Sequence, residues 1–445
     1  MHTSRRILPQ NPLAGSNNRQ MASAAQERFS KTITLSDAQR LTGPVAFNVM
    51  IKPAGSLCNL NCNYCYYLDK ADIYGGREPR MTEDVLEQCV KKYIEANEAP
   101  DVNFCWHGGE PLVMGLDFYR KAVEFQKRYG EGKNIHNTLQ TNGALLTRDA
   151  AEFFRDNDFL LGISLDGPEY IHDRYRKDKG GAPTFGKVMD AIKLMQDCGT
   201  QFNTMSTVNR MSEGHGLEVY RFLKSIGSQY MQFMPVVEHT VRKGSKDYIV
   251  HPGTEGARIA PWSVSPLAFG KFLCDIFDEW VCNDIGRYYV NHFDCTLAMW
   301  CGMQPGTCTY GETCGGNSII EHNGDLYVCD HFVYPEYKVG NVLEDDFREM
   351  MTSQKQIAFG IAKRNSLPRK CLQCKFQFAC RGECPKHRFS RTDSGETGLN
   401  ALCEGYYKYF THVAPYMDKM KEMLASQLPP SMIIPWARMK IGHAL

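Results

Sequence analysis

Apolar residues between positions 45 and 284 follow two periodicities that take turns along the chain. Short runs rich in β-branched and aromatic residues predict strands, and segments in which apolar residues recur every three or four positions predict helices. We expect strands within residues 45–53, 101–109, 135–143, 159–167, 201–209 and 228–237. We expect helices within residues 82–98, 116–130, 147–158, 184–199, 215–227 and 266–284.

This alternation of strand and helix predicts parallel strands joined by right-handed crossovers. Such units form either an open doubly wound sheet or most of a (β/α) barrel. Polar and glycine-rich segments follow the first strands in turn: a cysteine cluster, "WHGGEP", "QTNG" and "SLDG". Barrel enzymes gather their chemistry at the carboxyl ends of their strands. The sequence therefore predicts an α/β fold with a partial (β/α)6 barrel, in which these segments share one mouth.

Composition and charge narrow the class of protein. The chain has 445 residues, of which 43% are hydrophobic and 23% charged, as in ordinary globular proteins. A net charge of +1 argues against a nucleic-acid partner. No run of eighteen apolar residues occurs, which argues against a membrane span. Residues 1–44 lack both the strand–helix pattern and the apolar core of a secretory signal, so we expect a poorly ordered tail and a cytoplasmic protein.

Eighteen cysteines are the unusual feature of the composition. Disulfides are rare in a reducing compartment, where clustered cysteines more often bind metal or take part in catalysis. One group lies between Cys58 and Cys65, and a second lies between Cys308 and Cys403. The cysteines outside these groups are scattered singly, and we expect them to be small buried hydrophobic residues.

The first group, Cys58, Cys62 and Cys65, has the spacing C-x3-C-x2-C. A [4Fe–4S] cluster takes one thiolate for each iron. Three cysteines on one loop would therefore hold three irons and leave the fourth open to an outside molecule. The residues alone also allow a zinc site completed by a distant ligand, or plain structural cysteines.

This spacing, with an aromatic residue before the third cysteine and "GGEP" after the next strand, resembles the radical S-adenosylmethionine superfamily. The resemblance implies that Cys58, Cys62 and Cys65 bind a [4Fe–4S] cluster whose open iron chelates S-adenosylmethionine, which is then cleaved to a 5′-deoxyadenosyl radical. It also implies that Ser164 contacts the cofactor and that three residues of "GGEP" receive its amino group, namely Gly108, Gly109 and Glu110. A glycine pair lets the backbone approach a ligand closely, and a carboxylate accepts from an ammonium group.

The second group has spacings that suit either two zinc sites or two iron–sulfur clusters, and the residues alone do not decide between them. It resembles the SPASM extension, which follows some radical S-adenosylmethionine barrels and holds two auxiliary [4Fe–4S] clusters. The resemblance implies one cluster on Cys308, Cys314, Cys329 and Cys384, and another on Cys371, Cys374, Cys380 and Cys403. We therefore expect a barrel at 45–265, a linking helical segment at 266–307, a SPASM domain at 308–405 and a C-terminal helical tail at 406–445.

Several motifs together resemble the anaerobic sulfatase-maturating enzymes over roughly residues 45–425: "KPAGSLCNLNCNYCYYLDK", "WHGGEP", "SLDGPEYIHDRYR", "CDHFVYPEYKVGN" and "FACRGECPKHRF". The resemblance implies oxidation of a cysteine or serine of a sulfatase to Cα-formylglycine without oxygen. It makes Asp330 the catalytic base and places Tyr67 and His107 near the target side chain. It also implies three clusters, a partner with a Cys/Ser-x-Pro-x-Arg motif, and a low-potential electron donor such as ferredoxin or flavodoxin.

Other interpretations remain open from the residues. Asp330 also fits a turn aspartate that accepts from backbone amides, His107 a strand-end histidine bonded to backbone, and Tyr67 a core residue. The chain could be a different SPASM peptide maturase. A protein of another class, an iron–sulfur electron carrier or a zinc-binding protein without catalysis, is the second alternative. Finally, the polar segment 237–264 predicts a loop between barrel and cluster domain that reaches the substrate.

Overall fold

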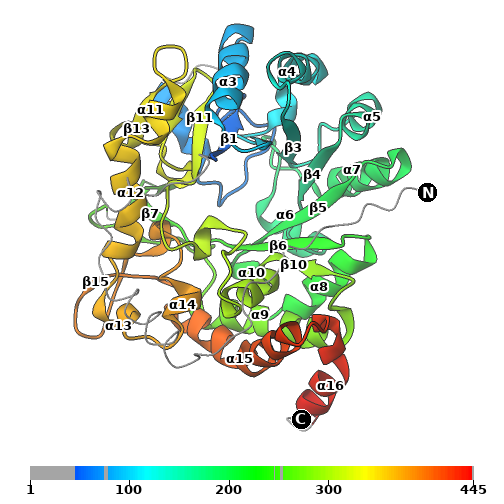
Figure 1. Ribbon diagram of the computed structural model, residues 1–445, viewed down its shortest axis with the longest axis vertical. Helices are drawn as coiled ribbons and strands as arrows, with labels where there is room; N and C mark the ends of the chain where they lie inside the picture. Colours follow the sequence, from blue (N-terminus) through cyan, green and yellow to red (C-terminus); the bar gives the residue numbers. More distant parts are fainter. Residues whose placement is uncertain (1–45, 75–78, 245, 251–253, 443–445) are drawn as a thin grey trace.

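The structure is a computed structural model that describes residues 46–74, 79–244, 246–250 and 254–442. Its centre is a sheet of ten strands in the order β10-β6-β5-β4-β3-β2-β1-β11-β12-β13 (Figure 1). Neighbouring strands are parallel from β10 to β11, and β12 is antiparallel to both of its neighbours, β11 and β13. The strands are β1 Asn48–Lys52, β2 Asp101–Trp106, β3 Asn134–Thr141, β4 Phe159–Ser164, β5 Phe202–Val208, β6 Tyr230–Pro235, β10 Tyr289–Val290, β11 Asn317–Glu321, β12 Asp325–Tyr327 and β13 Lys338–Asn341.

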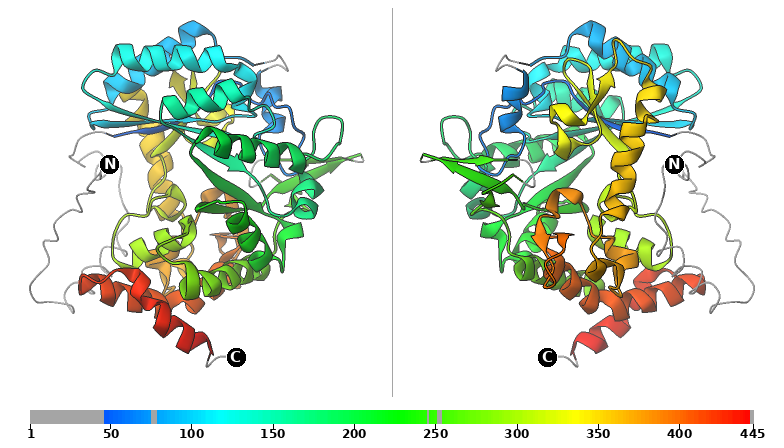
Figure 2. Two further views of the ribbon diagram at one scale, coloured as in Figure 1. Left: turned by 90° about the vertical axis from the view of Figure 1, so that its right-hand side faces the viewer. Right: turned by 90° about the vertical axis from the view of Figure 1, so that its left-hand side faces the viewer.

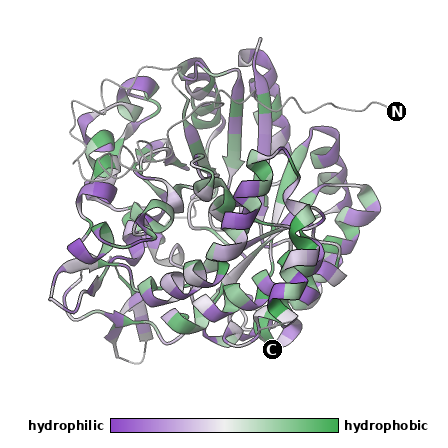
Figure 3. Ribbon diagram, turned by 60° about the horizontal axis from the view of Figure 1, so that its bottom comes forward, coloured by the Kyte–Doolittle hydropathy of each residue, from purple (hydrophilic) through white to green (hydrophobic). Residues whose placement is uncertain are grey.

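Helices on the outside connect successive strands, as the alternating pattern predicts. They are α3 Glu83–Ala96, α4 Leu116–Tyr129, α5 Arg148–Asp156, α6 Glu169–Tyr175, α7 Phe185–Cys198, α8 Gly216–Ser225 and α9 Pro266–Glu279. The first of them begins where Thr82 accepts from the backbone N–H of Val85. Hydrophobic and hydrophilic residues alternate around these helices, so each buries one face (Figure 3). The six expected strands and six expected helices are all present. Among the helices named in this paragraph, the short α6 was not predicted.

The sheet remains open, which confirms a partial barrel. Its buried strand residues form the core with the inward faces of the helices. Strand β1 is central, because it pairs with β2 on one side and with β11 on the other. The pairing with β11 runs from Asn48↔Asn317 to Lys52↔Glu321. A hairpin of the expected cluster domain thus continues the sheet of the barrel, and the end of β11 lies beside the end of β1.

The C-terminal third consists of short elements and one long helix. Its helices are α10 Asn291–Trp300, α11 Phe347–Met351, α12 Gln354–Asn365, α13 Arg369–Leu372, α14 Gln377–Cys380, α15 Cys403–Ala425 and α16 Ile434–Gly442, with the small strands β14 Ser390–Arg391 and β15 Thr397–Leu399. Short 3-10 helices along the whole chain are η1 Leu68–Tyr74, η2 Pro111–Met114, η3 Arg210–Ser212, η5 Cys308–Tyr310, η6 Asp330–Phe332, η7 Pro335–Tyr337, η8 Pro385–His387 and η9 Pro430–Ile433, and η4 Trp280–Asp284 is a π-helix.

The last long helix packs on the barrel rather than trailing from it (Figure 2). Helix α15 crosses α9 where two glycines meet, and a Cβ on Gly270 would lie 2.4 Å from the carbonyl oxygen of Gly405. Only glycine permits so close a crossing. Rings of Phe277 and Tyr416 extend the contact, with centroids 5.4 Å apart.

Segment 237–264 differs from its prediction as a loop. It forms a small antiparallel sheet of β7 His239–Lys243, β8 Lys246–Ile249 and β9 Arg258–Ile259, and its hairpin projects from the body of the molecule (Figure 2). Strands β7 and β8 pair with Thr240 opposite Ile249 and Val241 opposite Tyr248, so this part of the segment is a regular hairpin. The strands are short and mostly polar, so their pattern gave no strand signal. The expected tail at 1–44 lies outside the described residues, and none of the described helices has the length and apolar character to span a membrane.

Candidate active site

The cysteine loop follows β1 and rests on the backbone of the "GGEP" turn that follows β2. The N–H of Gly109 donates to the carbonyl of Gly55 at 2.7 Å, and the N–H of Glu110 donates to that of Leu57 at 2.9 Å. A Cβ on Gly109 would lie 2.2 Å from the carbonyl oxygen of Leu57. The glycine at 109 is therefore required by the approach of the cysteine loop itself, a reason that differs from the ligand contact expected from sequence.

The ends of four strands meet around this loop, as the barrel interpretation predicts. The carboxylate of Glu110 accepts from the Thr141 hydroxyl at 2.7 Å, the Asn142 backbone N–H at 2.8 Å and the Leu112 N–H at 3.0 Å. The Asn142 side chain in turn donates to Asn59 of the cysteine loop at 2.8 Å. Burial raises the pKa of Glu110 to about 7 despite these donors. Three donors leave one of about four acceptor sites on this carboxylate for an ammonium group.

Ser164 ends β4 on the same side, where its hydroxyl accepts from the amide of Gln140 at 3.0 Å. Gln140 belongs to the "QTNG" segment of β3, so the structure brings Ser164 and Glu110 to one mouth through their contacts with β3 and its end.

A buried network that the sequence analysis missed ties the cysteine loop to β4. The hydroxyl of Tyr64 donates to Asp166 at 2.5 Å, and the Arg176 guanidinium pairs with the other oxygen of Asp166 at 3.0 Å. All three side chains are buried. The aromatic position between Cys62 and Cys65, and an acid in "SLDG" followed by "RYR", are the signals that could have predicted it. The network ties the loop to the end of β4, in addition to its contact with the "GGEP" backbone.

The thiols of this loop are unlike free surface cysteines. Burial raises the pKa of Cys58 to about 12 and the pKa of Cys62 to about 12, although the Arg176 charge opposes the shift at Cys62. Their anions repel one another and Cys65. Buried thiols of this kind become thiolates when a metal centre compensates the charge, so the donor set fits an iron–sulfur cluster.

The auxiliary cysteines affect one another electrostatically. In addition to burial, nearby thiolates, among them that of Cys308, raise the pKa of Cys314, Cys329 and Cys384, and others, among them that of Cys374, raise the pKa of Cys371 and Cys403. The two ligand sets that the SPASM resemblance implies stay a prediction. Burial raises the pKa of Cys329 well above its usual value, and the neighbouring Cys384 raises it further. Each set has the number and chemistry of ligands that a four-iron cluster takes.

Asp330 begins η6 directly after the auxiliary cysteine Cys329, and its side chain contacts the cysteine loop and the end of β1. Its carboxylate forms an ion pair with Lys52 at the end of β1, and it accepts from the hydroxyl of Tyr66 in the cysteine loop. Burial would raise the pKa of Asp330, but the charge of Lys52 outweighs burial and holds it well below its usual range. The contacts that the structure shows for this carboxylate come from side chains, in contrast to the turn aspartate that the residues alone allowed.

The two residues expected near the target side chain have other contacts in the structure. The Tyr67 hydroxyl donates to Glu321 at the end of β11, and its ring lies under the Lys52 ammonium, 3.1 Å from the centroid. The Nδ1 of His107 accepts from the backbone N–H of Gly108 at 2.8 Å, and burial lowers the pKa of His107 to about 4. His107 is therefore neutral near pH 7, and Tyr67 lies in a buried cluster.

Tyr66 and Lys52 are the residues of this site that sequence reasoning missed. Each has a signal: Lys52 is a lone charge ending an apolar strand pattern, and Tyr66 is the first of two tyrosines after Cys65. Neither signal identifies Asp330 as the partner of Lys52 and Tyr66. Asp330 is far away in sequence, and the β1–β11 pairing brings it close to them.

Comparison with known proteins gives consistent matches. Residues 53–223 match the model of the radical SAM superfamily, and residues 308–375 match that of an iron–sulfur cluster-binding domain named SPASM. The chain is 50% identical to the serine-type anaerobic sulfatase-maturating enzyme of Bacteroides thetaiotaomicron, over 87% of this chain and 94% of that protein. It is 34% identical to the serine-type enzyme of Klebsiella aerogenes, over 83% and 86% of the two chains. It is 32% identical to the cysteine-type enzyme of Clostridium novyi, over 82% and 94%.

Solved structures agree. The structure of "native anSMEcpe with bound AdoMet and Cp18Cys peptide" is 29% identical, with a TM-score of 0.74 over 85% of this chain and 99% of that one. Streptococcus suis SuiB bound to the precursor peptide SuiA is 15% identical with a TM-score of 0.57, over 90% and 85% of the two chains, which shows a likeness of fold alone.

Proposed function

The chain belongs to the anaerobic sulfatase-maturating enzymes of the radical SAM superfamily, and we propose that it oxidises a cysteine or serine of a sulfatase to Cα-formylglycine without oxygen. Iron–sulfur clusters and S-adenosylmethionine are the cofactors of this fold family. Membership sets aside the interpretation as a non-catalytic iron–sulfur or zinc protein. One observation supports the proposed reaction most directly: Asp330 adjoins Cys329 of an auxiliary set and contacts Tyr66 of the cysteine loop.

We assign the clusters by residue. Cys58, Cys62 and Cys65 hold the cluster that serves S-adenosylmethionine, with Gly108, Gly109, Glu110 and Ser164 around the cofactor. The two sets of four auxiliary cysteines hold one cluster each, so the proposed total is three. When bound, these groups supply a 5′-deoxyadenosyl radical that removes hydrogen from the target Cβ, and an acceptor for the second electron.

The protein's own residues handle the proton. Oxidation of the target removes a hydrogen atom, one electron and the proton of the thiol or hydroxyl group. Asp330 is ionised and accepts from Tyr66 of the cysteine loop, which supports its proposed role as the general base that takes this proton. Lys52 compensates the charge of the buried carboxylate, and the Tyr66 hydroxyl fixes the orientation of one of its oxygens. Serine then yields the aldehyde directly, and cysteine yields a thioaldehyde that water hydrolyses.

The proposed partner is a sulfatase segment with the motif Cys/Ser-x-Pro-x-Arg, and the proposed electron donor is a ferredoxin or flavodoxin. The relative at 50% identity is named serine-type, and others are named cysteine-type, so both targets are tested. The reconstituted protein is incubated anaerobically with S-adenosylmethionine, dithionite and paired peptides that differ only in serine or cysteine. Mass spectrometry should show formylglycine at the target position. A cross-link or another modification would instead identify a different SPASM peptide maturase.

A further inference from the structure

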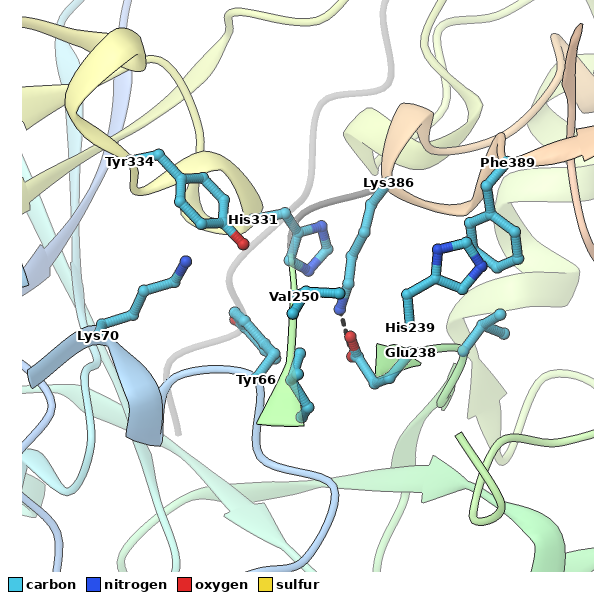
Figure 4. Close-up of a pocket in the computed structure, with 11 residues that line it drawn as sticks. Tyr66, Lys70, Glu238, His239, Val250, His331, Tyr334, Lys386 and Phe389 are labelled. Carbon is cyan, nitrogen blue, oxygen red and sulfur yellow. Dashed lines mark hydrogen bonds and ion pairs between the residues drawn. The ribbon is translucent and has the colours of Figure 1, made fainter. Parts of the chain in front are cut away.

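A pocket lies beside Asp330, where three parts of the chain meet (Figure 4). The cysteine loop and the turn after it contribute Tyr66 and Lys70, and the segment after β6 contributes five residues that include Glu238 and His239. The cluster domain contributes His331, Tyr334, Lys386 and Phe389. The residues used below line it together with others: Tyr66, Lys70, Glu238, His331, Tyr334 and Lys386. Tyr66 connects this pocket to the base, because its ring lines the wall and its hydroxyl donates to Asp330.

A buried ion pair between Glu238 and Lys386 forms one side of the pocket. The two side chains are 6% and 10% exposed, and the Lys386 ammonium also lies 4.3 Å from the centroid of the Tyr66 ring. The backbone of Glu238 is fixed, since its N–H donates to the Ser263 hydroxyl at 3.0 Å and its carbonyl accepts from Ala260 at 2.9 Å. The pair is therefore held in place by parts of the chain that are far apart in sequence.

Neither member of the pair is saturated by its partner. Among the described residues, the pair uses one N–H of the ammonium and one oxygen of the carboxylate. A lysine has three N–H donors and a carboxylate about four acceptor sites. Buried charges with spare hydrogen-bonding groups are costly unless something else satisfies them. The pocket thus presents a donor and an acceptor side by side, which is the complement of the C=O and N–H groups of a peptide chain.

Resting on the proposed function, we propose that this pocket binds the main chain of the sulfatase segment next to the target residue. Lys386 donates to a peptide carbonyl, and Glu238 accepts from a peptide N–H. A chain fixed at this pair passes over Tyr66 and brings its target side chain to Asp330. Because the contacts are to main-chain groups, they serve serine and cysteine targets equally.

The other groups that face the pocket agree with a polar but uncharged ligand. The His331 ring packs edge-on against the Tyr66 ring, with centroids 5.1 Å apart. The Lys70 ammonium lies 3.2 Å from the centroid of the Tyr334 ring, which already attracts it. The pair itself has no net charge, as suits a peptide group.

The first test removes the pair without leaving a buried charge unpaired. In Glu238→Met/Lys386→Met both charges go, and such apolar replacement of a buried pair is often neutral for stability. Fluorescence anisotropy of a labelled serine-motif peptide, with S-adenosylmethionine and full-length protein, should show binding weakened by at least about tenfold, the loss of roughly 1.4 kcal/mol. Lys386→Arg keeps donors and should bind within about threefold of wild type. Lys419→Met breaks the exposed pair of Lys419 with Glu422 in α15 and is the matched control, with unchanged binding.

The second test asks which peptide groups are read. Peptides in which one amide near the target is replaced by an ester lack a single N–H. At one position the ester should weaken binding to wild type and leave binding to the double variant unchanged. The inference is overturned if the double variant binds the peptide like wild type. A second outcome also overturns the inference. If the double variant binds the motif peptide and its arginine-to-alanine peptide equally well, while the ester still weakens binding to it, then the pair contacts the arginine side chain and not the main chain. Failure of wild type to form formylglycine from any motif peptide would count against the proposed function instead.

Discussion

Cys58, Cys62 and Cys65 lie on one short loop, whereas each auxiliary set collects its cysteines from segments spread between Cys308 and Cys403. The loop is held from outside by the barrel, through both the "GGEP" backbone and the Tyr64–Asp166–Arg176 network. As proposed, the auxiliary sets would hold their own domain together, since Cys384 is assigned with Cys308 although it follows Cys380 of the other set. Ligand loss should therefore be a local chemical event in the first region and a structural event in the second.

The largest effect is expected from removal of the whole loop triad. With three clusters the wild-type protein should bind about twelve irons, and Cys58→Ala/Cys62→Ala/Cys65→Ala should keep about eight. Cleavage of S-adenosylmethionine should be abolished, while thermal unfolding stays close to wild type because the barrel contacts of the loop remain. Iron analysis and product chromatography measure both. Retained cleavage, or stoichiometric zinc in place of iron, would contradict the cluster assignment.

Cys384→Ala should have the opposite pattern: lower stability, with cleavage of S-adenosylmethionine retained. One auxiliary set loses a ligand, so about four irons should be lost and the domain should lose stability, because metal binding and folding are coupled. Formylglycine formation should fall to background and the yield of folded protein should drop. Cleavage of S-adenosylmethionine without peptide should survive wherever the barrel folds. Cys282→Ala, at a buried cysteine outside both groups, is the control for simple loss of a core thiol and should keep its iron content.

Asp330→Asn tests the residue that joins the two regions. The change keeps the size of the side chain but removes its capacity to take a proton, so formylglycine should fall by at least roughly a hundredfold. Cleavage of S-adenosylmethionine should continue, because the triad and the "GGEP" turn are unchanged. Both products are measured in one reaction, with a peptide deuterated at the target Cβ. If the Asp330→Asn variant gives a nearly normal yield of formylglycine, Asp330 holds the structure together and takes no proton.

The same contrast decides what the sequence could predict. The strands and helices of the barrel follow from periodicities that lie within short segments, so their order and even the convergence of Glu110 and Ser164 could be predicted. The β1–β11 pairing joins residues that are far apart in sequence, and no local sequence pattern predicts it. Lys52 and Tyr66 were missed for that reason, since each becomes part of a site only when the β11–β12 hairpin, which pairs with β1, brings Asp330 to it. The assignment of a role to Tyr67 and His107 rested on family resemblance and stays a prediction.

The smallest expected effect concerns the tether of the loop. Tyr64→Phe keeps the ring but removes the hydroxyl that donates to Asp166, which retains its pair with Arg176 and the N–H of Thr207 at 3.0 Å. One buried hydrogen bond to a charged group contributes about 1.5–3 kcal/mol, so the free energy of unfolding should fall by roughly that amount, as measured in denaturant under anaerobic conditions. The triad cysteines are intact, and the iron content of freshly reconstituted protein should match wild type. Because the tether holds the loop against β4, iron should then leave the triad site faster in the presence of a chelator, while the auxiliary irons leave at the wild-type rate. Tyr170→Phe is the matched control, since its exposed hydroxyl bonds to Glu218 of α8 at 2.8 Å and its loss should alter neither rate. Equal loss of iron from all sites in Tyr64→Phe would mean that the loop and the auxiliary domain share one stability, and the contrast between a locally held and a self-assembled site would be wrong.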